Sequence, residues 1–287
     1  MLASQELEEF RAHTLEYSLA HGGVSYRAVC IPPEPGLNWS LSRLYTSEDA
    51  EQNPKLATRW GTILKRLGAN RAYGPSVGFM SGEIVAPCAF TTLIPLPPGV
   101  CLYRNKDLPS EGTLIDPRES VIASMGGCAC IVATGCGKCI VAHGGGASVM
   151  DMRAFGGKGH RRKHFSVVNA LAETVRNLRL DPQDFRIDVL FALPKDEYGQ
   201  PINHPVFGGQ NRRVWSEYLS TFDPEVAEVR DNMLYINLGK LIAAQAIEAG
   251  FGMARSRCNL TTNHASTRHA NPRMHDQRNA VIVVRTA

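Results

Sequence analysis

Hydrophobic positions recur at helical spacing in several stretches of the chain. The pattern predicts four helices, over residues 4–20, 46–69, 165–178 and 237–249. In the second of these, Leu56, Trp60 and Leu64 fall on one face. Gly68 and Gly250 follow two of the patterns and are typical helix stop signals.

Apolar, β-branched runs predict strands elsewhere. Residues 121–133 and 138–143 are joined by the short turn TGCGK and are typical of a hairpin. Two further runs predict strands over residues 187–193 and 280–284, and IPLPPG at 94–99 predicts a turn. Strands and helices alternate through the second half without a linker. We therefore predict one α/β (α+β) domain, with a mixed β-sheet and flanking helices.

The domain boundaries follow from the first helix. Its charged, amphipathic pattern resembles an appendage more than a core element, so we assign residues 1–30 to an N-terminal helical extension. Residues 31–287 would then form the catalytic domain.

Net charge, the length of uncharged runs and cysteine content indicate which partners, membrane spans and disulfides to expect. The net charge of the 287-residue chain is only +4, which gives no reason to expect nucleic acid or an anionic membrane as a partner. The longest uncharged run, 121–137, is short for a membrane span and rich in glycine, so we predict no span. Eight cysteines are a low density for a disulfide scaffold. We expect a cytoplasmic protein, or one translocated into another cell without a cleaved signal peptide.

The stretch most informative about chemistry is SMGGCACIVATGCGKCIVAHGGG, residues 124–146. Cys136 and Cys139 have the spacing of a zinc half-site, and Cys128 and Cys130 supply two more thiols. The two pairs lie several residues apart along a strand, however, so one ion could not be reached without bending it. We therefore predict no metal ligands here and leave zinc as the alternative. Cys136 and Cys139 could also form a redox pair or be two ordinary thiols.

The same stretch can also be interpreted as a catalytic site that contains a nucleophile and its base. The hairpin register places Cys128 close to residues 143–144, so Cys128 and His143 would be cross-strand neighbours able to form a thiolate–imidazolium pair. Backbone N–H groups at Gly126 and Gly127 would stabilise an oxyanion. Gly144 would leave room for a substrate chain.

Other polar residues leave alternatives open. Asn169, Asn203, Asp151 or a backbone carbonyl could orient His143. The basic segment GGKGHRRKHF, residues 156–165, could grip phosphate but is more typical of a solvated loop. Three later histidines have spacings that place them on no common face and do not predict a metal site; they are His264, His269 and His275.

The hairpin carries a resemblance to a known family. Ser124-Met125-Gly126-Gly127-Cys128, an apolar strand, a short turn and Ala142-His143-Gly144 resemble the catalytic hairpin of cytotoxic necrotizing factor-type deamidases. The resemblance implies that Cys128 attacks a glutamine carboxamide and that His143 is the base. It further implies a toxin or effector whose protein substrate would be a small GTPase.

From Gly36 onward the chain resembles the laccase-domain family, named polyphenol oxidases and zinc-dependent purine nucleoside phosphorylases, which shares a superfamily fold with the necrotizing factors. The segments that carry this resemblance include GCACIVA, IVAHGGG, YINLGKLIAAQAIEAGF, SRCNLTTNHASTRHA and RNAVIVV. Its Ser-x-Arg matches Ser266 and Arg268, which implies that Arg268 lines the substrate pocket. Three family residues are replaced by Gly127, Gly145 and Gly146.

These features together predict a divergent member of that superfamily. We expect a cysteine-dependent amidohydrolase that deamidates a glutamine side chain on a protein and needs no cofactor. The alternatives are a zinc-dependent purine nucleoside phosphorylase, a catalytically silent binding domain of the same fold, and a zinc-stabilised module on the hairpin cysteines.

Overall fold

The computed structural model describes residues 14–34, 37–75, 83–105, 110–150, 166–205, 208–257, 260, 264 and 278–287. Its strands form two large sheets and a small one. The seven-stranded sheet has the order β1-β2-β16-β8-β3-β6-β5, the six-stranded sheet β15-β11-β9-β10-β7-β4, and the small sheet β12-β14-β13.

The strands of the seven-stranded sheet are β1 (Leu15–His21), β2 (Val24–Ile31), β3 (Arg71–Gly74), β5 (Thr92–Leu96), β6 (Val100–Arg104), β8 (Glu119–Met125) and β16 (Asn279–Arg285). Those of the six-stranded sheet are β4 (Ile84–Val85), β7 (Gly112–Ile115), β9 (Ala129–Gly135), β10 (Lys138–Gly144), β11 (Arg186–Leu190) and β15 (Met253–Arg257). The small sheet contains β12 (Gly199–Pro201), β13 (Ala227–Arg230) and β14 (Met233–Ile236). The α-helices are α2 (Ser47–Gln52), α3 (Pro54–Arg66), α4 (Gly146–Met150), α6 (Val167–Asn177), α7 (Gly208–Glu217) and α8 (Leu238–Glu248).

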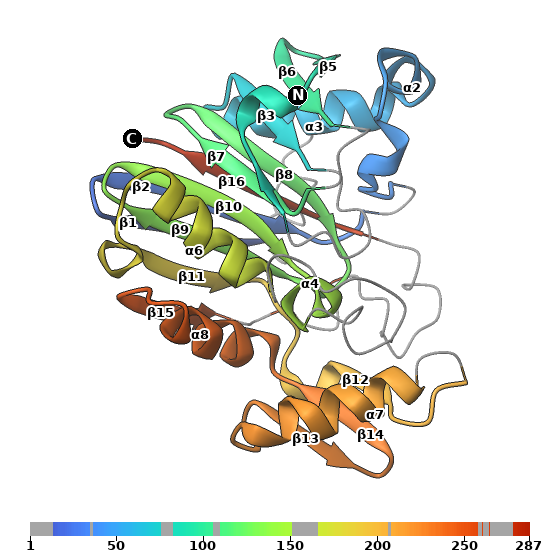
Figure 1. Ribbon diagram of the computed structural model, residues 1–287. Helices are drawn as coiled ribbons and strands as arrows, with labels where there is room; N and C mark the ends of the chain where they lie inside the picture. Colours follow the sequence, from blue (N-terminus) through green and yellow to red (C-terminus); the bar gives the residue numbers. More distant parts are fainter. Residues whose placement is uncertain are drawn as a thin grey trace.

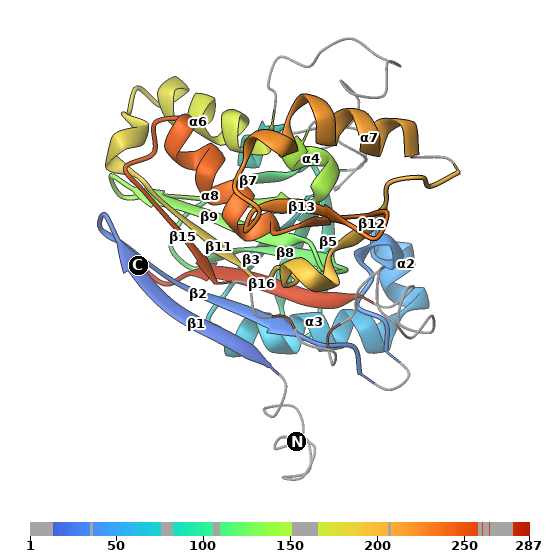
Figure 2. The same cartoon turned by 90° about the horizontal axis from the view of Figure 1, so that it is seen from below.

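The two large sheets pack face to face between layers of helices (Figure 1). Strand β2 shows this in its alternating side chains: Cys30 joins the core that contains the six-stranded sheet, while Val29 joins the core around Trp60 of α3. Figure 2 shows α2 and α3 along one side of the sandwich and α6 and α8 along the other. The α/β class predicted from the sequence is confirmed, with mixed sheets that contain both parallel and antiparallel pairs.

The helical periods locate most helices but not every boundary. The helix predicted over 46–69 is two helices, because Pro54 lacks an N–H and disfavours helical geometry at Asn53. Gly68, at φ 84°, follows α3 as a stop. The helices predicted over 165–178 and 237–249 are confirmed as α6 and α8. The strand predicted over 280–284 is β16, and that over 187–193 is β11, which ends earlier at Leu190.

The N-terminal prediction is wrong where the structure describes it. Residues 15–21 form strand β1, in which Leu15, Tyr17 and Leu19 are half-buried and the residues between them are exposed or less buried. This alternation is the two-residue period of a strand. Strand β1 pairs with β2 throughout, so residues 15–31 belong to the main sheet and not to a helical extension. Residues 1–13 lie outside the described part.

The strand predicted over 121–133 is also wrong as a single strand. It is interrupted at residues 126–128, where Gly127 has φ 91°. The part before the break, β8, belongs to the seven-stranded sheet, and the part after it, β9, belongs to the six-stranded sheet. The chain therefore crosses from one sheet to the other immediately before the hairpin, and Cys128 lies in that crossing.

In the part of the chain that the structure describes, no helix has both the length and the apolar character needed to span a membrane.

The packing of α3 on the β5–β6 connection gives a stability test. A Cβ at Gly61 would lie 1.9 Å from the carbonyl oxygen of Pro97. Gly61→Ala should therefore lower the free energy of unfolding by about 1–3 kcal/mol, although alanine favours helix. Thr62→Ala, at an exposed position of the same helix, is the matched control and should be neutral or slightly stabilising. Urea denaturation measures both, and a Gly61→Ala protein as stable as the control would contradict this packing.

Candidate active site

Cys128 lies in the crossing between β8 and β9, which connects the two large sheets. It is partly exposed, whereas Ala129 directly after it is fully buried. The preceding Gly127 has a positive φ, which glycine adopts without strain, and its carbonyl accepts a hydrogen bond from the N–H of Leu193 at 3.3 Å. The crossing thus brings a thiol to the surface while its flanking residues stay anchored in the core.

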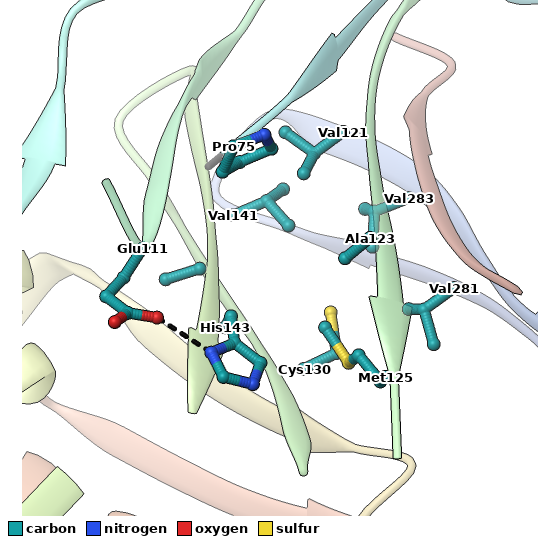
Figure 3. A pocket seen from close by; sticks show the side chains of 11 residues that line it. Pro75, Glu111, Val121, Ala123, Met125, Cys130, Val141, His143, Val281 and Val283 are labelled. Carbon is teal, nitrogen blue, oxygen red and sulfur yellow. Dashed lines mark hydrogen bonds and ion pairs between the residues drawn. The ribbon is translucent and has the colours of Figure 1, made fainter. Parts of the chain in front are cut away.

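His143 lies on β10 and pairs with a carboxylate from the neighbouring strand. The register of β7 and β10 places Gly112 opposite Ala142, which brings Glu111 opposite His143. The N–H of His143 donates to the carbonyl of Glu111 at 2.8 Å, and the ring Nδ1 lies 2.7 Å from Glu111 Oε2. The two side chains are 12% and 1% exposed. Figure 3 shows the pair side by side at one edge of a pocket.

The imidazole of His143 also interacts with Cys128. Burial alone would lower the pKa of His143. Cys128 and Glu111 raise it, each through its charge and a hydrogen bond to the ring, and the resulting pKa is about 10. Because Nδ1 faces Glu111, Nε2 is the nitrogen left for the thiol. The structure therefore brings Cys128 and His143 together, as the sequence predicted, and adds Glu111 as a third member.

The hairpin register differs from the predicted one. Cys130, not Cys128, is the residue directly opposite His143. Cys128 directly precedes β9 and interacts with the imidazole from outside the paired part of the strand. Cys130 is fully buried, and burial together with Cys139 raises the pKa of its thiol to about 12. A thiol with that pKa is a poor nucleophile at neutral pH, so Cys128 is the candidate.

A small apolar pocket lies behind the imidazole, between the two sheets (Figure 3). The space between its lining side chains, open solvent included, is about 250 Å³. Its lining is aliphatic apart from the two members of the pair and Cys130, and consists of Pro75, Glu111, Val121, Ala123, Met125, Cys130, Val141, Ala142, His143, Val281 and Val283. Such a wall excludes water from one side of the His143–Glu111 pair and strengthens their electrostatic attraction.

The predicted pocket residues occupy different environments. Gly126 is partly exposed and Gly127 is buried beside the candidate nucleophile. Gly144 faces the core, since a Cβ there would lie 3.0 Å from Ile131 and Ile242. Gly145 lies against the His143 imidazole instead, where a Cβ would come within 2.7 Å of His143 Cε1. Arg268, and the basic segment 156–165, lie outside the described residues.

The residues proposed to orient His143 lie elsewhere or outside the described part. Asn169 is exposed at the start of α6 and hydrogen-bonds Ser166, and the Asn203 amide oxygen accepts from Arg212 at 2.9 Å. Asp151 is outside the described residues. Glu111 was missed because it precedes a short strand far from the hairpin in sequence. Only the β7–β10 pairing identifies it, and the sequence carries no local signal for that pairing.

The hairpin cysteines do not converge on one point. Cys136 is exposed in the turn at φ 49°, Cys139 is buried, and seven-residue strand β9 separates Cys128 from the turn. Cys136 and Cys139 form no disulfide with each other, which gives no support to a redox pair there.

The described residues also do not fit a zinc ion. Among them, no three His, Cys, Asp or Glu side chains gather as a metal site would require. From the described residues, an ion between Cys128 and His143 Nε2 would have two ligands, because Glu111 contacts the opposite ring nitrogen. Structural zinc needs about four ligands and catalytic zinc about three. His264 is buried, and His269 and His275 lie outside the described part.

Comparison with known proteins supports the fold. No family model matches the chain, and no curated protein matches it significantly. Among solved structures, a DUF152 protein of Neisseria meningitidis is similar at a TM-score of 0.59 and 12% identity, covering 96% of this chain and 100% of that one. The hypothetical protein YfiH of Bacillus licheniformis gives 0.59 and 12%, covering 93% and 97%. YlmD from Geobacillus stearothermophilus gives 0.55 and 15%, covering 96% and 93%.

Identities this low establish a shared fold and nothing further. The chain therefore shares its fold with these proteins, and the predicted α/β class, with mixed sheets and flanking helices, is confirmed. The relation to the necrotizing factors stays a prediction.

The charge of His143 gives a pH test. Its pKa is raised from 6.5 to about 10, so the folded state binds the proton more tightly than the unfolded state. The resulting stabilisation should be complete below pH 6.5 and lost as the pH rises through about 10. The difference in unfolding free energy between wild type and His143→Gln should shrink over that range. Histidine NMR titration checks the pKa directly, and a His143 that titrates near 6.5 would contradict the ion pair.

Proposed function

We propose that the protein is a cysteine hydrolase of amide bonds, with Cys128 as nucleophile and His143 as general base. The observation that carries this proposal is the hydrogen bond between Cys128 and an imidazole that favours its protonated form. An imidazolium beside a thiol stabilises the thiolate, which is the reactive form of cysteine. The base is in turn oriented by Glu111, an arrangement shared by hydrolases of unrelated folds.

The reaction proceeds in two halves. The thiolate of Cys128 attacks the carbonyl carbon of a carboxamide and forms a tetrahedral oxyanion. The imidazolium of His143 gives its proton to the nitrogen as the C–N bond breaks, which releases ammonia and leaves a thioester. The imidazole then takes a proton from water, the resulting hydroxide attacks the thioester, and the carboxylic acid leaves with the thiolate restored.

The crossing before β9 supplies a candidate donor for the oxyanion. The carbonyl of Gly127 points to the N–H of Leu193. The C=O and N–H of a planar trans peptide point in opposite directions, so the N–H of Cys128 is directed away from Leu193. This orientation supports the Cys128 N–H as the group that stabilises the oxyanion, as at other nucleophiles whose own amide takes part.

A glutamine side chain on a protein is the substrate that this site supports best. Cys128 is partly exposed, which allows a side chain of another protein to reach it. The pocket behind His143 has an almost wholly aliphatic wall and offers few polar groups to a polar small molecule. That a small GTPase carries the glutamine rests on the resemblance of the hairpin alone.

A zinc-dependent nucleoside phosphorylase is favoured only by the fold it would share with this chain. The described residues offer two ligands where catalytic zinc requires about three. No step of the proposed reaction passes through a metal.

Ammonia release from glutamine-bearing proteins tests the proposal. Cys128→Ser and His143→Ala should each lower the rate by about 10²–10⁴-fold, because one removes the nucleophile and the other its base. Cys130→Ser is the matched control, since Cys130 is the buried thiol directly opposite His143. It should keep most of the activity.

Two outcomes would contradict this assignment. Deamidation that survives Cys128→Ser would exclude the nucleophile. Phosphate-dependent cleavage of adenosine by zinc-loaded protein, with no ammonia from glutamine, would favour the phosphorylase.

A further inference from the structure

We infer that Glu111 is a positioning residue whose charge balances the His143 imidazolium, so that the reactive thiol selects uncharged substrate groups. This inference rests on the proposed function and adds a substrate class to it. The class is carboxamides and other neutral acyl groups, as opposed to groups that carry a carboxylate or phosphate near the carbonyl.

The contact between Glu111 and His143 is fixed by the backbone as well as by the two side chains. Glu111 Oε2 lies 2.7 Å from His143 Nδ1, and the Glu111 side chain is 1% exposed. Its backbone is fixed as well, because its N–H donates to the carbonyl of Glu83 and its own carbonyl accepts from His143, both at 2.8 Å. A buried carboxylate with a fixed backbone cannot turn away from the imidazole toward water. It therefore fixes the orientation and the tautomer of the ring.

Gly145 and Gly112 keep this arrangement free of steric conflict. A Cβ at Gly145 would lie 2.7 Å from His143 Cε1, and one at Gly112 would lie 2.1 Å from the carbonyl of Val141. The first glycine allows the chain to pass the ring, and the second lets β7 approach β10. Both close approaches serve to place Glu111 and His143 against each other.

The charges at the site then sum to one negative charge. In the reactive state the thiolate of Cys128 is negative, the imidazolium of His143 is positive, and the carboxylate of Glu111 is negative. Among the described residues, Cys130 is the other titratable group on the pocket wall, and its thiol is neutral because burial raises its pKa to about 12. The remaining side chains of the wall are apolar, and they screen charge poorly.

This net negative charge distinguishes the site from a thiolate–imidazolium pair alone. An unbalanced imidazolium beside the thiolate attracts anionic reagents. With Glu111 in place, the positive charge is offset by a carboxylate on the far side of the ring, and an anion that approaches the thiol is repelled. A neutral carboxamide carries no such penalty.

The ratio of two alkylation rates measures this selectivity without any substrate. The full-length protein is treated with neutral iodoacetamide or anionic iodoacetate at pH 7, and the modification of each cysteine is followed by mass spectrometry. Glu111→Gln is close to isosteric and removes the charge, so the iodoacetamide-to-iodoacetate ratio at Cys128 should fall about tenfold. Glu111→Asp keeps the charge and should retain most of the ratio, whereas a purely structural role would make both variants alike.

An equal ratio in wild type and Glu111→Gln would overturn the inference. If Glu111→Gln fails to fold, as judged by circular dichroism, a Cys128→Ala protein provides a second measurement. In that variant a charged Glu111 carboxylate can only accept a hydrogen bond from His143 Nδ1. Nitrogen NMR of the variant should therefore show the neutral ring protonated at Nδ1. A neutral ring protonated at Nε2 would also overturn the inference.

Failure of this inference is distinguishable from failure of the proposed function. Exposed Cys88 serves as an internal reference thiol. Wild-type Cys128 that reacts no faster than Cys88 would refute the nucleophile itself. A fast Cys128 whose ratio does not respond to Glu111 would leave the nucleophile intact and refute only the charge balance.

Discussion

The hydrogen bond between Glu111 and His143 is the interaction on which the candidate site depends. It joins the residue before β7 to β10, directly beyond the last paired residues of these two strands, Gly112 and Ala142. The aliphatic wall on one side keeps water from competing for it. Because the carboxylate occupies Nδ1, the opposite nitrogen is directed to the thiol, and a histidine in a sheet becomes a base with a defined partner.

The two-sheet architecture explains why the thiol and the imidazole have different exposure. The chain leaves the seven-stranded sheet after Met125 and enters the six-stranded sheet at Ala129. Cys128 lies in this short crossing and is partly exposed, while His143 projects from within a strand and is largely buried. The proposed hydrolase needs a nucleophile that substrate can reach and a base within hydrogen-bond distance of it, and this difference in exposure is compatible with both.

Much of the outer framework could be predicted from the sequence, because its signals are local. Helices α6 and α8 follow from their apolar periods, and Pro54 and Gly68 mark the ends of α3. The pairing of Cys128 with His143 followed from their position on one hairpin, although the register is shifted so that Cys130 lies opposite the histidine.

Other features depend on contacts that no local pattern encodes. Strand β1 has helical as well as two-residue periodicity, and pairing with β2 decides between them. The interruption at Gly127 reflects a change of sheet within one apolar run. Glu111 becomes a neighbour of His143 only through the pairing of β7 with β10, which are separated by β8 and β9 along the chain.

The central claim is that Cys128 and His143 form a thiolate–imidazolium pair, and the rate of Cys128 alkylation by iodoacetamide between pH 5 and 9 tests it most directly. The account predicts that Cys128 reacts rapidly well below the pH of about 8.5 at which a free thiol ionises, and that His143→Ala abolishes this advantage. A Cys128 whose rate follows that of exposed Cys88 across the whole range, with or without His143, would contradict it.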